Sequence, residues 1–252
     1  RSVTHHGITL ADPYAWLRAD NWREAMVDPA LLPADIAAYL KAENAYCDSV
    51  LAPVEADRKA LVAELRGRIA ENDWSVPGGD GAYAYGTRFT EGAEQPCLIR
   101  LSRAEGDAVA EGNPPRNAET LFDANREAEG EAYFRLGSVR HSPNHAALAW
   151  TADRNGSELF TLSVRDLHSG SDTVLLERVT PAVAFASDAR TVFAVEIDDN
   201  HRPARVVTKA AGDDRRVIYE EADAGFFVSV SETLSGGYIV IDAHDHETSE
   251  VR

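Results

Sequence analysis

The 252-residue sequence is poor in cysteine, in lysine and in long apolar runs. Its two cysteines, Cys47 and Cys97, are far apart and form neither a C-x-x-C metal pair nor a disulfide framework, so we expect free thiols in a reducing compartment. No apolar run approaches the roughly 20 residues of a membrane-spanning helix, and residues 1–20 lack the apolar core of a signal peptide. These absences predict a cytoplasmic protein.

Basic residues are also scarce. The sequence has 42 acidic and 25 basic residues, which gives a net charge of −17. This charge repels phosphate backbones and anionic lipids and attracts cationic peptides, so we expect neither a nucleic-acid partner nor a membrane partner. We interpret most of it as a solvated acidic surface. The only lysines are Lys41, Lys59 and Lys209, and this preference for arginine indicates a GC-rich bacterial genome.

A strand-sized apolar segment with a turn recurs through the second half of the chain. Ser142, Ser187 and Ser231 stand in the turns that precede these segments, at intervals of 45 and 44 residues. Short strands repeated at this period are typical of β-propeller blades, which bury their faces only by stacking on one another. The third repeat breaks off at Val251-Arg252. The sequence therefore predicts a mainly β protein with a partial, incomplete propeller.

The first part of the chain has a different pattern. Residues 1–30 read as an extended arm with brief helical turns, whose tyrosines and tryptophans we interpret as packing anchors. Apolar residues at near-helical spacing then predict helices over 34–51 and 54–71. We therefore divide the chain into an arm with two helices, residues 1–72, and the first propeller blades, residues 73–252.

After Trp74 the apolar period changes from helical to two, which predicts strands. Residues 82–85 and 96–101 should form a hairpin, and the polar, Gly- and Pro-rich residues 104–118 should form an exposed loop. The remaining predicted strands lie near residues 120–122, 139, 146–150, 159–164, 173–176, 182–185, 191–197, 204–208, 216–219, 226–230 and 238–241.

Several segments, in this order, resemble the amino-terminal half of the oligopeptidase B group of the prolyl oligopeptidase family of serine peptidases. The resemblance extends from about His6 to the last residue. The segments are Asp12–Arg18, Tyr39–Tyr46, Glu91–Pro96, Leu121–Asn125, Tyr219–Val230 and Thr248–Arg252.

The resemblance implies a seven-bladed propeller that covers an α/β-hydrolase domain, with the amino-terminal helices packed on that domain. It also implies a serine oligopeptidase that needs no cofactor and cleaves short peptides after Arg or Lys, while the propeller limits access by size. The family's catalytic serine lies in a G-x-S-x-G turn, which this sequence lacks. We therefore expect the catalytic domain beyond Arg252, assign no catalytic, cofactor or metal residue here, and expect this segment alone to be inactive.

Two other functions remain open at this point. One is a non-enzymatic propeller module that binds peptides or proteins, and the other is an oligopeptidase that cleaves after proline. The reading frame after Arg252 separates the peptidase from the module, because only the peptidase requires a G-x-S-x-G turn in a further domain.

Four groups of residues could suggest other chemistry, and we interpret each as structural. Asp242–Glu247 and His5-His6 could ligate a metal, but we expect a polar turn and solvated histidines. Gly78, Gly79 and Gly81 lack the following Lys-Ser/Thr of a phosphate loop and read as a hairpin turn. Three further residues could suggest a triad, but two of them occupy equivalent turn positions in the repeats. They are Ser142, Asp188 and His201.

Overall fold

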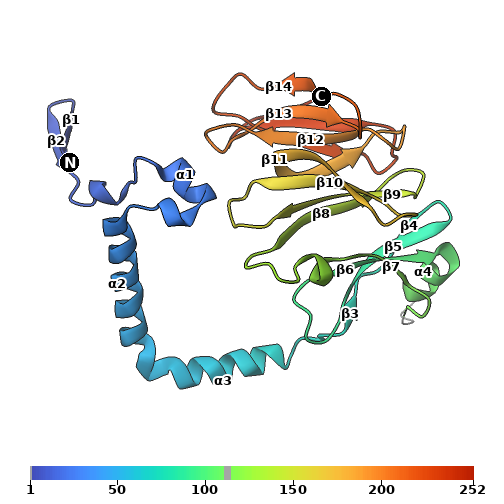
Figure 1. Ribbon diagram of the computed structural model, residues 1–252, viewed down its shortest axis with the longest axis horizontal. Coiled ribbons are helices and arrows are strands. Elements are labelled where there is room, and N and C mark those ends of the chain that lie inside the picture. The colour runs from blue at the N-terminus through green and yellow to red at the C-terminus, as the bar shows by residue number, and fades with distance from the viewer. Residues whose placement is uncertain (1, 111–114) are drawn as a thin grey trace. The chain divides into compact units, whose positions relative to one another are not determined.

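The computed structural model describes residues 2–110 and 115–252. The chain divides into two units, Arg1–Ala70 and Glu71–Arg252, of which the first is mostly helical and the second mostly β (Figure 1). None of the helices in the described residues combines the length and the apolar character needed to cross a bilayer.

The first unit begins with a β-hairpin that the sequence did not predict. Strands β1 (Ser2–His5) and β2 (Ile8–Ala11) pair antiparallel across a two-residue turn. The turn residues, His6 and Gly7, both have positive φ, 51° and 78°. A histidine followed by glycine therefore forms a tight hairpin turn here, which gives His6 a backbone role.

The two long helices follow short helical turns. Helix α2 (Ala34–Leu51) has the predicted bounds. Helix α3 (Glu55–Arg66) ends five residues earlier than predicted, because Gly67 follows it and the next two N–H groups form tighter turn bonds. The short elements are η1 (Ala15–Leu17), α1 (Trp22–Val27), η2 (Pro29–Leu31) and η3 (Ala52–Val54).

Aromatic residues hold the arm against the start of α2, as the sequence predicted. The rings of Trp16 and Tyr39 meet edge to face with centroids 5.2 Å apart. Ile36, on the same helix, and Ala19, in the arm, are both buried. These contacts order the first turns of α2, and they do not extend to its second half.

The second unit begins with a five-stranded sheet, which we call blade 1. Its strands are β3 (Asp73–Trp74), β4 (Gly78–Asp80), β5 (Tyr83–Phe89), β6 (Cys97–Ser102) and β7 (Glu119–Asp123). The β5–β6 hairpin confirms the predicted pairing, and Gly81, with φ 56°, makes the turn between β4 and β5. The glycines at 78, 79 and 81 therefore belong to a hairpin, as predicted.

The predicted loop over residues 104–118 is wrong in its first part. Helix α4 (Arg103–Ala110) covers β5 instead, and residues 111–114 lie outside the described part of the chain. The reason is Gly106, which is buried in this helix: a Cβ built there would lie 2.2 Å from the Cβ of Ala84. A residue that normally disfavours helices is used here for close helix–strand packing.

Blades 2 and 3 share one seven-stranded antiparallel sheet because a single strand belongs to both. Strand β11 (Asp172–Phe185) pairs with β10 through its first half and with β12 through its second half. Two separate strands were predicted for this segment, which is wrong: the chain bends at Arg178, where φ is 59°, without leaving the sheet. The other strands are β8 (Arg135–His141), β9 (Ala147–Asp153), β10 (Phe160–Asp166), β12 (Val192–Ile197), β13 (Pro203–Lys209) and β14 (Arg216–Glu220).

Blade 4 contains three antiparallel strands. They are β15 (Phe227–Glu232), β16 (Ile239–His244) and β17 (Ser249–Val251). The third strand is thus present, although it is short, in the segment where the sequence analysis expected the repeat to break off.

Three buried apolar clusters hold the blades together, and each of them spans a junction between neighbouring blades. Phe122 of blade 1 packs with Trp150 of blade 2, with ring centroids 5.0 Å apart. Phe160 and Val192 belong to the cluster between blades 2 and 3, and Val206 and Val230 to the cluster between blades 3 and 4. This is the stacking by which propeller blades bury their faces, and it confirms the predicted fold class.

Candidate functional site

The residues that could suggest a catalytic triad lie in three different turns. The Ser142 hydroxyl is buried and accepts hydrogen bonds from two backbone N–H groups of its own turn, at 3.2 and 2.9 Å. The Asp188 carboxylate does the same in the corresponding turn of the next blade, at 2.9 and 2.8 Å. His201 lies in the turn between β12 and β13. The predicted turn roles of Ser142 and Asp188 are confirmed.

The segment Asp242–Glu247 is only in part the turn that was predicted. Asp242 and His244 lie on β16, which stays paired with β15, and their side chains are 2.8 Å apart. The turn begins at Asp245, whose carboxylate accepts hydrogen bonds from the N–H groups of Glu247 and Thr248. The turn prediction is therefore wrong for the first residues, because strand pairing continues through His244.

A compact cluster of aromatic, imidazole and carboxylate side chains joins blade 1 to blade 2. The Tyr85 ring stacks on the His141 ring, with centroids 3.8 Å apart and an angle of 15° between the planes. The Tyr85 hydroxyl is 2.8 Å from Nδ1 of His145, and Oδ2 of Asp80 is 3.7 Å from Nε2 of His141. Asp80, His141 and His145 are the group of possible metal ligands that the described residues bring together.

The environment of the cluster favours a neutral imidazole at His141. Burial lowers the pKa of His141, although the Ser142 carbonyl and the Asp80 carboxylate both act to raise it. Burial also raises the pKa of Tyr85, so its hydroxyl stays protonated at neutral pH. The cluster therefore contains a neutral phenol and a neutral ring beside one carboxylate.

Arg100, on β6, contacts residues of the cluster and of the turn beside it. Its guanidinium lies 4.5 Å from the centroid of the Tyr83 ring and donates a 3.1 Å hydrogen bond to the carbonyl of His145. The same guanidinium pairs with Glu119 at 2.7 Å. This arginine fixes the backbone of the turn that presents His145, and its charge is balanced by a carboxylate.

This cluster was not predicted from the sequence. His141 and His145 are four residues apart, on either side of the Ser142-Pro143 turn. Asp80 comes from another blade, and only the β4–β5 hairpin together with the stacking of blades brings it near. The available signal was the pair of histidines that flank the first repeat turn.

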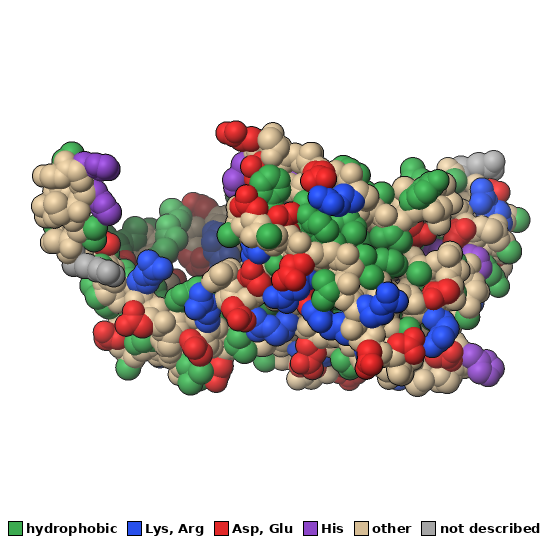
Figure 2. All heavy atoms as spheres, turned by 90° about the horizontal axis from the view of Figure 1, so that it is seen from above, with side chains coloured by type: hydrophobic (Ala, Val, Ile, Leu, Met, Phe, Trp, Pro, Cys, Tyr) green, Lys and Arg blue, Asp and Glu red, His purple; other side chains and the backbone are tan. Residues whose placement is uncertain are grey.

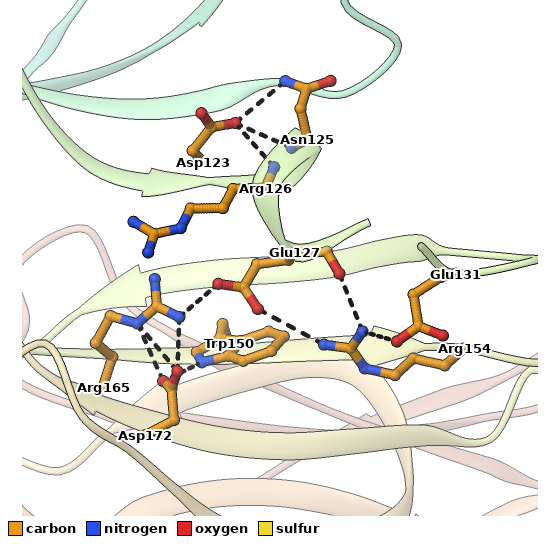
Figure 3. A network of polar contacts seen from close by, with 9 residues as sticks. All are labelled: Asp123, Asn125, Arg126, Glu127, Glu131, Trp150, Arg154, Arg165 and Asp172. Carbon is orange, nitrogen blue, oxygen red and sulfur yellow. Dashed lines mark hydrogen bonds and ion pairs between the residues drawn. The ribbon is translucent and has the colours of Figure 1, made fainter. Parts of the chain in front are cut away.

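A second polar network crosses the same junction between blades 1 and 2 (Figure 3). Arg165, on β10, pairs with Asp172 and with Glu127, at 2.6 and 2.7 Å, and its side chain is only 15% exposed. Asp172 also accepts a 2.9 Å hydrogen bond from the indole Nε1 of Trp150. The guanidinium carbon of Arg165 lies 4.9 Å from the centroid of Phe122. Arg165 therefore makes a polar and an apolar contact with blade 1, to Glu127 and Phe122, and an ion pair within blade 2, to Asp172.

A short helix supplies Glu127 to this network. Helix α5 (Ala124–Glu127) is capped by Asp123, whose carboxylate accepts hydrogen bonds from the N–H groups of Asn125 and Arg126, at 3.0 and 3.4 Å (Figure 3). Arg154, from blade 2, binds the Glu127 carbonyl at 3.0 Å and the Glu131 carboxylate at 2.6 Å. The cap thus positions a carboxylate that the neighbouring blade requires.

Asp123 should stabilise the protein in a pH-dependent way. Burial raises its pKa, but hydrogen bonds from Asn125 and Cys97 and from backbone N–H groups outweigh burial and hold the pKa below its usual value. Such a carboxylate stabilises the fold above its unfolded-state pKa of about 3.9, and this contribution is lost as the pH falls through the lower folded-state pKa. Asp123→Ala should therefore lower the melting temperature more at pH 7 than at pH 3. Asp199→Ala is the matched control because the Asp199 side chain is 98% exposed, and an equal effect of Asp123→Ala at both pH values would contradict the assignment.

The helical unit presents an apolar surface of a different kind. Residues 40–70 are all described, and none of them is buried. The exposed large apolar side chains of this stretch are Leu40, Tyr46, Val50, Leu51, Val54, Leu61, Val62, Leu65 and Ile69. Elsewhere the surface is mixed: Figure 2 shows acidic and basic side chains interspersed with apolar ones on the face that it draws. We call the apolar side chains of residues 40–70 the helical apolar surface.

Comparison with known families and sequences gives a consistent result. The family described as prolyl oligopeptidase, N-terminal beta-propeller domain, matches residues 1–252. Dipeptidyl aminopeptidase BI of Pseudoxanthomonas mexicana is 30% identical over 98% of this chain and 34% of its own length. Protease 2 of Moraxella lacunata is 24% identical over 98% of this chain and 34% of its own length. The chain thus spans about a third of the length of the curated relatives it matches.

Solved structures show the same fold. Oligopeptidase B from Leishmania major matches 97% of this chain and 33% of its own chain, with a TM-score of 0.82 and 23% identity. Oligopeptidase B from Trypanosoma brucei, solved in a closed form with covalently bound antipain, matches 97% of this chain and 32% of its own, with a TM-score of 0.79 and 24% identity.

Proposed function

This chain belongs to the prolyl oligopeptidase family and corresponds to the N-terminal β-propeller domain of that family. We propose that it forms part of a serine oligopeptidase that hydrolyses short peptides after arginine or lysine. The observation that supports this most strongly is the family match over residues 1–252. The chain contains no G-x-S-x-G turn, so the nucleophile is proposed to lie in an α/β-hydrolase domain outside these residues.

In this proposal the propeller limits access to the active site by size. A size filter requires a wall that does not open for large substrates. The apolar clusters at the blade junctions and the Arg165 network supply such rigidity, because they bury the contacts between neighbouring blades. Short peptides would pass and folded proteins would be excluded.

The helical apolar surface supports a second part of the proposal, that residues 1–72 pack on the hydrolase domain. Soluble proteins seldom leave a long series of apolar side chains in water. Tyr46, on the second half of α2, is 68% exposed, and Leu61 and Leu65 are exposed one turn apart on α3. A hydrophobic partner surface would remove them from water, and a catalytic domain of the same protein is the partner that the family membership suggests.

The preference for arginine or lysine is supported by the resemblance to oligopeptidase B and by charge. With 42 acidic and 25 basic residues, the chain contributes a negative field that attracts cationic peptides. The two cysteines, Cys47 and Cys97, are free thiols, which agrees with the proposed cytoplasmic location.

The specificity can be tested on the protein as its gene encodes it, with three fluorogenic substrates. One is an amino-blocked peptide with arginine before the scissile bond, one is a blocked peptide with proline there, and one is a dipeptide with a free amino group that ends in arginine. We expect kcat/KM for the blocked arginine substrate to exceed that for the proline substrate at least about 100-fold. A preference for proline, or an absolute requirement for the free amino group, would replace the proposal by post-proline or dipeptidyl cleavage.

A further inference from the structure

We propose that Asp80, His141 and His145 form a binding site for a divalent transition metal ion of the zinc type. The three residues come from different elements: Asp80 ends β4, His141 ends β8, and His145 lies in the turn before β9. Each offers one ligand atom, and these atoms all lie within 4.8 Å of one another. Two imidazoles and a carboxylate are a donor set that suits zinc and its neighbours in the transition series.

The hydrogen bonds of the two histidines leave the same nitrogen of each ring for a metal. Nδ1 of His141 lies 3.2 Å from the Ser142 carbonyl oxygen, to which it can donate a hydrogen bond. Nδ1 of His145 lies 2.8 Å from the Tyr85 hydroxyl oxygen, which can accept a hydrogen bond from it in the same way. Metal-binding histidines usually donate from the second nitrogen to such a group, which fixes the tautomer and the ring. Nε2 is then the ligand atom of both rings.

Zinc binding requires the three ligand atoms, which are at most 4.8 Å apart, to move closer together. Ligand atoms about 2.0–2.2 Å from a tetrahedral zinc ion lie roughly 3.4 Å from each other. Nε2 of His141 and Oδ2 of Asp80 are already 3.7 Å apart. Asp80 is exposed at the end of its strand, so its carboxylate can move toward the two rings.

The surroundings hold the imidazoles and leave room beside them. Stacking on Tyr85 fixes the plane of the His141 ring. Gly81 lies so close to His145 that a Cβ built there would be 3.2 Å from Nε2. The glycine therefore keeps the space next to the proposed ligand atom free of a side chain.

The charges nearby are compatible with a cation. The guanidinium of Arg100 is the positive group that contacts this turn, and Glu119 pairs with it at 2.7 Å. A bound ion would connect blade 1 to blade 2 and leave a fourth tetrahedral position for water or another ligand.

The test uses the protein as encoded, purified without a histidine tag and freed of metal with a chelator. Titration with Zn²⁺ in a calorimeter should show a site whose Kd rises at least about 100-fold in His141→Ala and in His145→Ala. His168→Ala, which removes an exposed histidine of another turn, is the matched control and should bind like the parent. Tyr85→Phe keeps all three ligands and loses the hydroxyl that hydrogen-bonds His145 and Arg100, so it should weaken binding about 10-fold.

A spectroscopic measurement keeps the test independent of stability. Co²⁺ bound in place of zinc should give visible absorption bands in the parent and in His168→Ala, and these bands should be absent in His141→Ala and in His145→Ala. Near-ultraviolet circular dichroism confirms that each variant is folded. The proposal is overturned if the parent binds no metal, or if both histidine variants bind Zn²⁺ and Co²⁺ like the parent.

Discussion

Replacing Arg165 with methionine should destabilise the propeller by about 3 kcal/mol, because the substitution leaves the Asp172 carboxylate without its cation and the Glu127 carboxylate with only Arg154, at 3.6 Å, at a largely buried blade junction. Methionine retains most of the apolar stem that packs on Phe122, so the loss measures charge and hydrogen bonding more than volume. A loss of this size corresponds to a fall in melting temperature of roughly 6–12 °C. Tryptophan fluorescence is a suitable probe because the Trp150 indole belongs to the same network.

Two variants separate this effect from a general loss of arginine. Arg58→Met removes an arginine that is 61% exposed and pairs with Glu55 on the surface of α3, and it should leave the melting temperature unchanged. Arg165→Lys keeps the charge but loses the two-pronged geometry, so its melting temperature should lie between those of the parent and Arg165→Met. An Arg165→Met protein as stable as the parent would show that the network adds nothing to the stacking of the blades.

Residues 1–252 produced alone should self-associate. Within its own unit the helical apolar surface is uncovered, since no residue from 40 to 70 is buried. Association or binding of a hydrophobic dye is the expected response of such a surface. Analytical ultracentrifugation over a range of concentrations should show species larger than the 27.4 kDa monomer.

A double variant identifies the surface responsible. Leu61→Gln with Leu65→Gln should shift the distribution toward monomer and reduce dye binding, because both apolar side chains are exposed on α3. Lys59→Gln with Arg66→Gln changes two exposed polar residues of the same helix and should leave self-association as it is. A monodisperse parent monomer that binds no dye would contradict the view that these helices pack on another domain.

The regular elements could be predicted from the sequence because local pattern decides them. Helix α2 has the predicted bounds, since its apolar spacing and the preceding Pro33 are local signals. Helix α4 was missed because its glycine lowers helix propensity, and only the contact with Ala84 explains it. Strand β11 was divided in two because the sequence does not show that one strand can serve two blades.

The two sites at the junction between blades 1 and 2 could not be predicted in the same way. Arg165 and Glu127 are 38 residues apart in the sequence. Strands β5, β6 and β7 lie between Asp80 and His141 along the chain. Such pairs depend on how blades stack, which a repeat period indicates only in outline. The turn roles of Ser142 and Asp188, in contrast, repeat with the blades and were correctly predicted.

The most direct test of the central claim is to find which serine a fluorophosphonate inhibitor labels in the protein as its gene encodes it. The account predicts loss of peptidase activity with labelling of one serine in a G-x-S-x-G turn outside residues 1–252, and no labelling when this segment is produced alone. Labelling of a serine within residues 1–252, or peptide hydrolysis that the inhibitor leaves intact, would contradict the proposal that this chain is the non-catalytic propeller of a serine oligopeptidase.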